Sequence, residues 1–186
     1  MPHYLDIRLR PDPEITANHL MSALLSKLHR ALVQIDNHAI GVSFPGWHAT
    51  RRTLGTILRL HGPQAALQVM ADNAWLAGMR DHVDLATVAA APATTSHWRV
   101  KRIQVKSNPE RLRRRQIRRH GITEEEARQK IPDSAAQASS LPFAVVHSTS
   151  TGQRFHLFIH QEEVSQARDG TFNAYGLSSQ ATVPKF

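Results

Sequence analysis

The sequence predicts an α+β protein in which an N-terminal ferredoxin-like βαββαβ domain precedes a C-terminal α+β domain that carries an arginine-rich helix. Three observations predict it: the hydrophobic periods of the first 92 residues, a linker-like stretch at 92–96, and a block of basic residues at 99–119. The domain boundary is expected in the linker, with residues 1–94 in the first domain and residues 95–186 in the second.

The first two elements have clear hydrophobic periods. Residues His3–Arg10 alternate apolar and polar side chains, which is the period of a strand with one buried face. Leucines recur every four residues through Ala17–Ile35, which predicts a helix with one apolar stripe. His29 falls just past the edge of that stripe, so its ring is expected at the rim of the buried surface.

The remaining elements of the first half complete a split βαβ order. Strands are predicted over Ala39–Phe44, Leu54–His61 and, more weakly, Val83–Ala91, and a second helix over Pro63–Met79. The order strand, helix, strand, strand, helix, strand is that of the ferredoxin-like motif. That fold hosts many functions, RNA binding among them, so it does not identify an activity.

In the second half, a basic strand over Trp98–Lys106 is followed by a helix with clear end signals. Asn108 suits the N-cap and Pro109 the first helical position, and the helix should run to His120 because Gly121 is a natural residue to follow a helix. The other predicted elements are a short helix starting at the capping box of residues 123–126, strands over Phe143–Ser150 and Arg154–His160, and two closing segments, 171–177 and 183–186.

Composition excludes several classes of protein. The 186 residues include no cysteine, which excludes disulfide scaffolds, thiolate zinc sites, iron–sulfur clusters and cysteine nucleophiles. The sequence has no long apolar run and no charged segment followed by a short apolar one, so neither a membrane span nor a secretory signal is expected. A cytoplasmic protein without a membrane partner is the expectation.

The positive charge is concentrated in one internal block. The formal net charge is +8, from 23 Lys+Arg and 15 Asp+Glu. Residues 99–119 contain ten basic residues and a single acid, Glu110, so the block carries +9 and the rest of the chain −1. Eight of the ten are arginines, whose planar guanidinium pairs bidentately with phosphates and base edges. A focused patch of this kind is typical of nucleic-acid binding.

The helix within this block is nearly pure arginine. Helical spacing places four arginines on one face: Arg111, Arg115, Arg118 and Arg119. A fifth, Arg114, is a neighbour of Arg118 one turn away. Like charges at these spacings destabilise a helix by a few tenths of a kcal/mol per pair, a cost that a bound polyanion removes. A solvated surface is the alternative, but solvated faces usually mix both signs, so nucleic-acid contact is favoured.

The residues of this helix leave both RNA and DNA open as the polyanion. A helix that reads bases in the DNA major groove usually mixes Asn, Gln, Ser and Arg, whereas this helix is nearly pure Arg and offers mainly phosphate contacts. Side chains read the deep, narrow major groove of an RNA stem poorly, but an arginine helix could contact its phosphates where the groove opens beside a loop. Base readers would then come from elsewhere. Arg102 and Gln104 are two apart in an extended segment and would point the same way, Arg toward guanine and Gln toward adenine. Ordinary strand-surface polarity is the competing interpretation.

Candidate chemistry centres on histidine rather than on a metal. RNA can be cleaved without a metal when a base removes the 2′-hydroxyl proton, and His is suited to this near neutral pH. Among twelve histidines, His29 stands out by its position, although a structural role is the commoner one for such a residue. His156 and His160 lie four apart on a strand, roughly 13 Å, too far to share a metal. No nuclease-type cluster of carboxylates and no G-x-S-x-G around Ser148 is present.

Several motifs together resemble one known family. They are the opening HYLDIRLRPDPE, the KLH that ends at His29, RIQVKSNPERLRRR followed by RRH, the segment HSTSTGQRFHLF, and the closing YGLS and VPKF. Spread over essentially the whole chain, they resemble the CRISPR repeat endoribonuclease of type I-F systems, which processes precursor CRISPR RNA. The resemblance implies a metal-independent, cofactor-free enzyme that cuts the repeat stem-loop at the 3′ base of its stem. It also implies that the enzyme leaves a 2′,3′-cyclic phosphate and a 5′-hydroxyl, stays bound to the mature RNA, and joins the other subunits of the interference complex.

The resemblance also implies residue roles. His29 would be the general base, Ser148 would hold the attacking nucleotide, and Tyr175 would orient the site through His29. The implied RNA-binding residues are Arg102, Gln104, Arg111, Arg114, Arg115, Arg118, Arg119, Ser150, Thr151 and Phe155. Phe155 would stack under the last base pair of the stem. Strand alternation, however, places Phe155 on the apolar face with Leu157 and Ile159, so packing in the core competes with stacking.

Two other functions fit the same sequence features. One is a non-catalytic subunit that binds structured RNA without cutting it. The other is a DNA-binding regulator that uses the arginine helix, which would prefer duplex DNA over an RNA hairpin at matched salt concentration.

Overall fold

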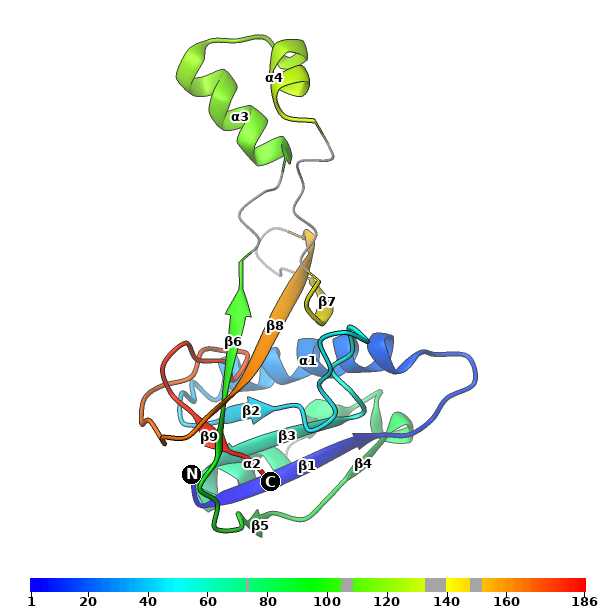
Figure 1. Ribbon diagram of the computed structural model, residues 1–186. Coiled ribbons are helices and arrows are strands. Elements are labelled where there is room, and N and C mark those ends of the chain that lie inside the picture. Colours follow the sequence, from blue (N-terminus) through cyan, green and yellow to red (C-terminus); the bar gives the residue numbers. More distant parts are fainter. Residues whose placement is uncertain (73, 105–108, 133–139, 148–151) are drawn as a thin grey trace. The chain divides into compact units, whose positions relative to one another are not determined.

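The computed structural model describes residues 1–72, 74–104, 109–132, 140–147 and 152–186. For Arg111 it describes the backbone but not the side chain. The protein is a mixed α+β structure with two sheets (Figure 1). The chain forms two compact units, one made of Met1–Ile103 with Leu141–Phe186 and the other of Gln104–Ser140. Both sheets belong to the first unit.

The first sheet is built around the N-terminal strand. Its strands are β1 (His3–Leu9), β2 (Gly41–Ser43), β3 (Ile57–Gly62) and β4 (Val83–Leu85), in the order β2-β3-β1-β4 with every pair antiparallel. The short β5 (Ala89–Ala90) also pairs with β1. Alternate residues of β1 are fully or nearly fully buried, as the period-two pattern predicts: Leu5, Ile7 and Leu9. The prediction for the first strand is confirmed.

Helix α1 (Ala17–Gln34) confirms the leucine-stripe prediction. Thr16 caps its N-terminus by accepting a hydrogen bond from the backbone N–H of His19. The stripe is buried at Leu20, Met21, Leu24, Leu25, Leu28 and Leu32. His29 is only half-buried, at the rim where the helical period places it. Burying one stripe thus fixes which way the neighbouring histidine projects.

The second predicted helix is shorter than expected. Helix α2 covers Gln64–Asp72 and is followed by two short 3₁₀ turns, Ala74–Leu76 and Arg80–His82, rather than continuing to Met79. The Trp75 indole N–H donates to the carbonyl of Met70 at 2.8 Å and so satisfies a backbone group near the end of the helix. The predicted strand over 83–91 is likewise divided into β4 and β5.

The second sheet collects strands from the second half of the chain. It contains β6 (His97–Ile103), β7 (Phe143–His147), β8 (Arg154–Val164) and β9 (Val183–Pro184), in the order β7-β8-β6-β9 with every pair antiparallel. β8 runs four residues beyond its predicted end because it stays paired with β6 as far as Val164 opposite His97. The closing segment 171–177 contains a turn.

The two sheets share one core. The buried Gln161 on β8 reaches the residue after β2, where its amide accepts from the Phe44 N–H at 2.9 Å and donates to the Phe44 carbonyl at 3.0 Å. β2 also packs against β6 and β9, and α1 packs against β7. This packing brings α1, from the first half of the chain, beside strands from the second half.

The described part of the second unit contains two helices, α3 (Pro109–His120) and α4 (Glu124–Lys130). Gly121 follows α3 with φ +62°, the left-handed conformation that ends a helix. The predicted capping box starts α4: the Glu126 N–H donates to the Thr123 hydroxyl, and the Thr123 N–H donates to the Glu126 carboxylate. Both predicted ends are confirmed. In the described part of the chain, no helix has the length and apolar character that spanning a bilayer requires.

Candidate active site and RNA interface

His29 is held by a backbone carbonyl from the other end of the chain. Its Nδ1 lies 2.9 Å from the carbonyl oxygen of Ala174. A carbonyl can only accept, so Nδ1 carries the proton and donates it. In the neutral ring, Nε2 then keeps its lone pair and is free to take a proton. The contact therefore selects the tautomer in which the ring can act as a base through Nε2.

The aromatic ring of Tyr175 fixes the plane of the imidazole. The two rings are stacked, with centroids 4.1 Å apart and planes 6° apart. Tyr175 is half-buried, and this burial raises the pKa of its hydroxyl, an effect that the nearby Arg102 partly offsets. The hydroxyl is thus held neutral, and the side chain contacts His29 through the face of its ring. The structure brings these two predicted site residues into direct contact.

Arg102 and Phe155 form a second contact in the same unit. Arg102 on β6 pairs with Ile159 on β8, so both project from the face of the sheet that also carries Phe155. The guanidinium carbon of Arg102 lies 5.2 Å from the centre of the Phe155 ring, within range of a cation–π interaction. Phe155 is half-buried and packs against the hydrophobic core. Its packing with the core is therefore observed, while stacking on RNA stays a prediction.

The arginines of α3 are largely open to solvent. Arg114, Arg115, Arg118 and Arg119 are all exposed. Arg113 differs, because it is half-buried and its Nε donates to the carbonyl of Ile131 at 2.8 Å, which ties α3 to the end of α4. The single acid of the block, Glu110, lies 3.8 Å from Arg114. One arginine thus serves the fold of this unit, while four others present guanidinium groups at its surface.

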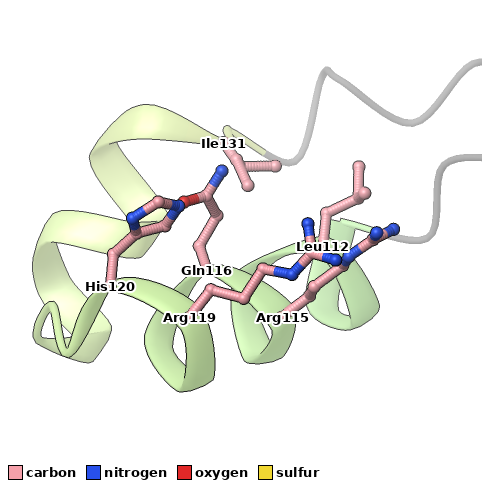
Figure 2. Close-up of a pocket in the computed structure, with 6 residues that line it drawn as sticks. All are labelled: Leu112, Arg115, Gln116, Arg119, His120 and Ile131. Atoms are coloured by element: carbon pink, nitrogen blue, oxygen red, sulfur yellow. The ribbon is translucent and has the colours of Figure 1, made fainter.

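A pocket lies beside these arginines within the second unit (Figure 2). It has a volume of about 330 Å³ and is lined by Leu112, Arg115, Gln116, Arg119, His120 and Ile131. Figure 2 shows the side chains of Arg115 and Arg119 side by side and those of Gln116 and His120 directed toward one another. The lining combines apolar carbon with cationic and amide groups, a mixture suited to the backbone and base edges of a nucleic acid.

Of the other predicted site residues, the structure describes the side chain of Gln104 but not those of the remaining four. Gln104 is exposed at the start of the second unit. Ser148, Ser150 and Thr151 lie outside the described residues, as does the side chain of Arg111. Over the part of the chain that the structure describes, no group of three or more His, Asp or Glu side chains is arranged to hold a metal ion.

Sequence reasoning missed the turn that carries Ala174. A backbone carbonyl leaves no mark in a residue pattern, so Ala174 could not be singled out as a contact of His29. The available signal was the pair Asn173 and Gly176, residue types that favour turns, on either side of Tyr175.

Comparison with known proteins shows similarity over the full length of the chain. A family model described as CRISPR-associated protein (Cas_Csy4) matches residues 4–186. The CRISPR-associated endonuclease Cas6/Csy4 of Pseudomonas aeruginosa (strain UCBPP-PA14) is 50% identical over 187 residues, covering 100% of both chains. A CRISPR-associated endonuclease Cas6/Csy4 of Escherichia coli (strain UTI89 / UPEC) is 43% identical over 188 residues, again covering 100% of both.

Proposed function

Because the chain belongs to the Cas_Csy4 family of CRISPR-associated proteins, we propose that it is an endoribonuclease that processes precursor CRISPR RNA. Its substrate is the stem-loop of the CRISPR repeat, cut at the 3′ base of the stem. The observation that carries the proposal is the full-length identity of 50% to a curated endonuclease. The contact of His29 with Ala174 and Tyr175 supports it, because it leaves one imidazole nitrogen available as a base.

The proposed reaction is an internal transesterification. Nε2 of His29 takes the proton of the 2′-hydroxyl, and the 2′-oxygen attacks the adjacent phosphorus. The bond from phosphorus to the 5′-oxygen breaks, and that oxygen takes a proton from solvent water and leaves as a 5′-hydroxyl, while a 2′,3′-cyclic phosphate remains on the other product. Ser148 holds the attacking nucleotide, and Tyr175 keeps the imidazole in plane. The imidazole supplies the base itself, so the step calls for no metal or other cofactor.

RNA binding is proposed to combine a phosphate grip with a few base contacts. The exposed arginines of α3 supply the grip, and Arg111 is assigned to the same face. Arg102 and Gln104 read a guanine and an adenine at the foot of the stem, each contact discriminating by about 1–3 kcal/mol. Phe155 stacks under the last base pair. Ser150 and Thr151 contact the RNA near the scissile phosphate.

The N-terminal part of the first unit is proposed to be a ferredoxin-like domain. An antiparallel sheet in the order β2-β3-β1-β4, with α1 between β1 and β2 and α2 between β3 and β4, supports this assignment. We assign the catalytic histidine to a domain of residues 1–94 and the binding of the hairpin to a domain of residues 95–186. The cleaved RNA stays bound to the arginine helix, and the protein remains in the cytoplasm as a subunit of the type I-F interference complex.

A cleavage assay with a CRISPR repeat hairpin tests the proposal. We expect the wild-type protein to cut a labelled hairpin in EDTA and to leave a 2′,3′-cyclic phosphate. A hairpin with a single 2′-deoxy nucleotide on the 5′ side of the scissile phosphate should bind and stay intact. His29→Ala should bind without cutting, a loss of about 10²–10⁴-fold in rate for a missing general base. His19→Ala, on the exposed side of the same helix, is the matched control.

The outcomes separate the alternatives. Tight binding with no cleavage by the wild type would favour a non-catalytic RNA-binding subunit. A preference for duplex DNA at matched salt concentration would favour a DNA-binding regulator. Normal cleavage by His29→Ala would show that another group is the base.

A further inference from the structure

The turn Asn173–Leu177 is organised by one side chain. The Asn173 side-chain oxygen accepts the backbone N–H of Tyr175 at 2.8 Å and that of Leu177 at 3.2 Å. The backbone of the same residue adds two bonds: the Asn173 N–H donates to the Leu177 carbonyl at 2.9 Å, and the Gly176 N–H donates to the Asn173 carbonyl at 2.8 Å. Asn173 therefore takes part in four hydrogen bonds that close the turn around Ala174 and Tyr175.

The turn is also fastened on both sides. The Val42 N–H on β2 donates to the Gly176 carbonyl at 2.9 Å. Gly176 has φ +71°, and a Cβ there would lie 2.5 Å from Cγ1 of the buried Val42, so only glycine fits this close approach. On the other side, the Phe172 N–H donates to the His38 carbonyl and His38 Nδ1 donates to the Phe172 carbonyl, both at 3.0 Å. The contacts with Val42 and His38 fix both ends of the turn, and the hydrogen bonds of Asn173 fix the backbone between them.

Both contacts that define the state of His29 come from inside this turn. Ala174 supplies the carbonyl that takes the Nδ1 proton, and Tyr175 supplies the ring that stacks on the imidazole. We propose that Asn173 is a positioning residue for RNA cleavage, because its side-chain oxygen holds the turn that fixes the tautomer and orientation of His29. The inference rests on the proposed function of His29 as the base. Asn173 itself acts only through the two residues that follow it.

The chemistry of the side chain makes the inference testable by substitution. Asn173 is exposed, so replacing it with Ala leaves no cavity but removes the acceptor for two backbone N–H groups. Asp keeps an oxygen in the same place and can accept both bonds, so Asn173→Asp is the conservative variant. Asp12 offers a control outside this turn, because one of its oxygens accepts the N–H groups of Glu14 and Ile15, each at 2.9 Å, ahead of α1. Its other oxygen lies 3.2 Å from Nδ1 of His82, so Asp12→Ala removes at least as many contacts as Asn173→Ala.

The first measurement reports the tautomer of His29 and needs no activity. Long-range ¹H–¹⁵N NMR spectra of the RNA-free protein, above the pH at which the ring is protonated, distinguish a protonated Nδ1 from a protonated Nε2. We expect Nδ1–H with a free Nε2 in the wild type, in Asn173→Asp and in Asp12→Ala. Asn173→Ala should show a mixture of the two tautomers. An unchanged tautomer in Asn173→Ala would overturn the proposal.

The second measurement is the single-turnover cleavage rate of the same variants on the repeat hairpin, with hairpin affinity measured in parallel. Asn173→Ala should bind RNA within twofold of the wild type and cut it about 10- to 100-fold more slowly, the size expected when a catalytic group is misplaced. Asn173→Asp should restore the rate to within about threefold, since the turn is remade. Asp12→Ala should cut at the wild-type rate.

Thermal unfolding midpoints of all variants separate positioning from general destabilisation. If Asn173→Ala and Asp12→Ala lost stability and rate in parallel, Asn173 would be merely structural, and the proposal would be overturned. The same holds if Asn173→Asp cut as slowly as Asn173→Ala. If the wild type failed to cut RNA at all, the proposed function would fail, while the NMR tautomer would still decide what Asn173 does to His29.

Discussion

Tyr175 contacts His29 through the face of its ring, and this decides what the side chain can contribute. A stacked ring holds the imidazole in one plane and covers one of its faces. The hydroxyl points along the ring plane and is therefore outside the stack. Orientation by Tyr175 thus depends on the aromatic ring, whereas proton transfer would depend on the hydroxyl.

At the residue scale, the ring and the hydroxyl can be separated by mutation. Tyr175→Phe keeps the stack, so we expect a single-turnover cleavage rate within about threefold of the wild type. Tyr175→Leu removes the ring and should slow cleavage by about 10-fold or more, because the imidazole is no longer held in plane. Hairpin affinity should be unchanged in both. Equal losses in the two variants would assign the role to the hydroxyl instead.

At the element scale, α3 combines an intrinsically unfavourable charge pattern with a specific anchor. Four exposed arginines repel one another along the helix, and Arg114 has a weak partner in Glu110. Arg113 bonds to the carbonyl of Ile131, and Ala127 of α4 is fully buried. The face of α3 that packs on α4 thus holds the helix in place, while the exposed face keeps the cationic groups that a polyanion would neutralise.

The salt dependence of RNA binding tests that division. Arg115→Ala and Arg119→Ala should each weaken hairpin binding and lower the slope of log affinity against log salt concentration by about one, as expected for losing one phosphate contact. Arg128→Ala, on α4 and paired with Glu124 at 3.0 Å, should keep the wild-type slope. An unaltered slope in the Arg115 and Arg119 variants would rule out phosphate contact by these side chains.

At the scale of the whole molecule, a buried histidine couples folding to pH. His61 on β3 is fully buried, and Ser43 on β2 lies 2.8 Å from its Nε2. Burial, with smaller contributions from Arg59 and the N-terminus, lowers the pKa of His61 from 6.5 to about 3. The unfolded chain therefore binds this proton at a higher pH than the folded one, and stability falls as the pH drops from 6.5 toward 3.

Replacing His61 should flatten this dependence. In chemical unfolding between pH 6.5 and 4.5, His61→Gln should lose less stability per pH unit than the wild type, by up to about 1.4 kcal/mol per pH unit for one proton. Glu162 affects stability only at lower pH. Hydrogen bonds from Lys101 and Arg99 lower its pKa from 4.5 to about 2, so its contribution to folding stability is lost as the pH falls from 4.5 toward 2. An identical slope in wild type and variant above pH 4.5 would contradict the assignment to His61.

Much of the fold was predictable because local patterns determine local structure. The leucine period of α1, the alternation of β1, the capping box at Thr123 and the glycine after α3 each specify an element or its end through backbone and packing rules. The position of His29 at the rim of the stripe follows from the same helical geometry. Element lengths were predicted less well, since the pairing of β8 with β6 and the indole of Trp75 depend on partners elsewhere in the chain.

The sequence alone determined the element order, the concentrated positive charge and the position of His29 at the rim of the helix stripe. Only the tertiary structure decided how the imidazole of His29 is held. Ala174 and Tyr175 are about 145 positions from His29 and meet it because β2, α1 and the strands of the second sheet share one core. A backbone carbonyl that selects a tautomer, and the turn that holds it, arise from packing between distant segments. No local residue pattern encodes such a contact.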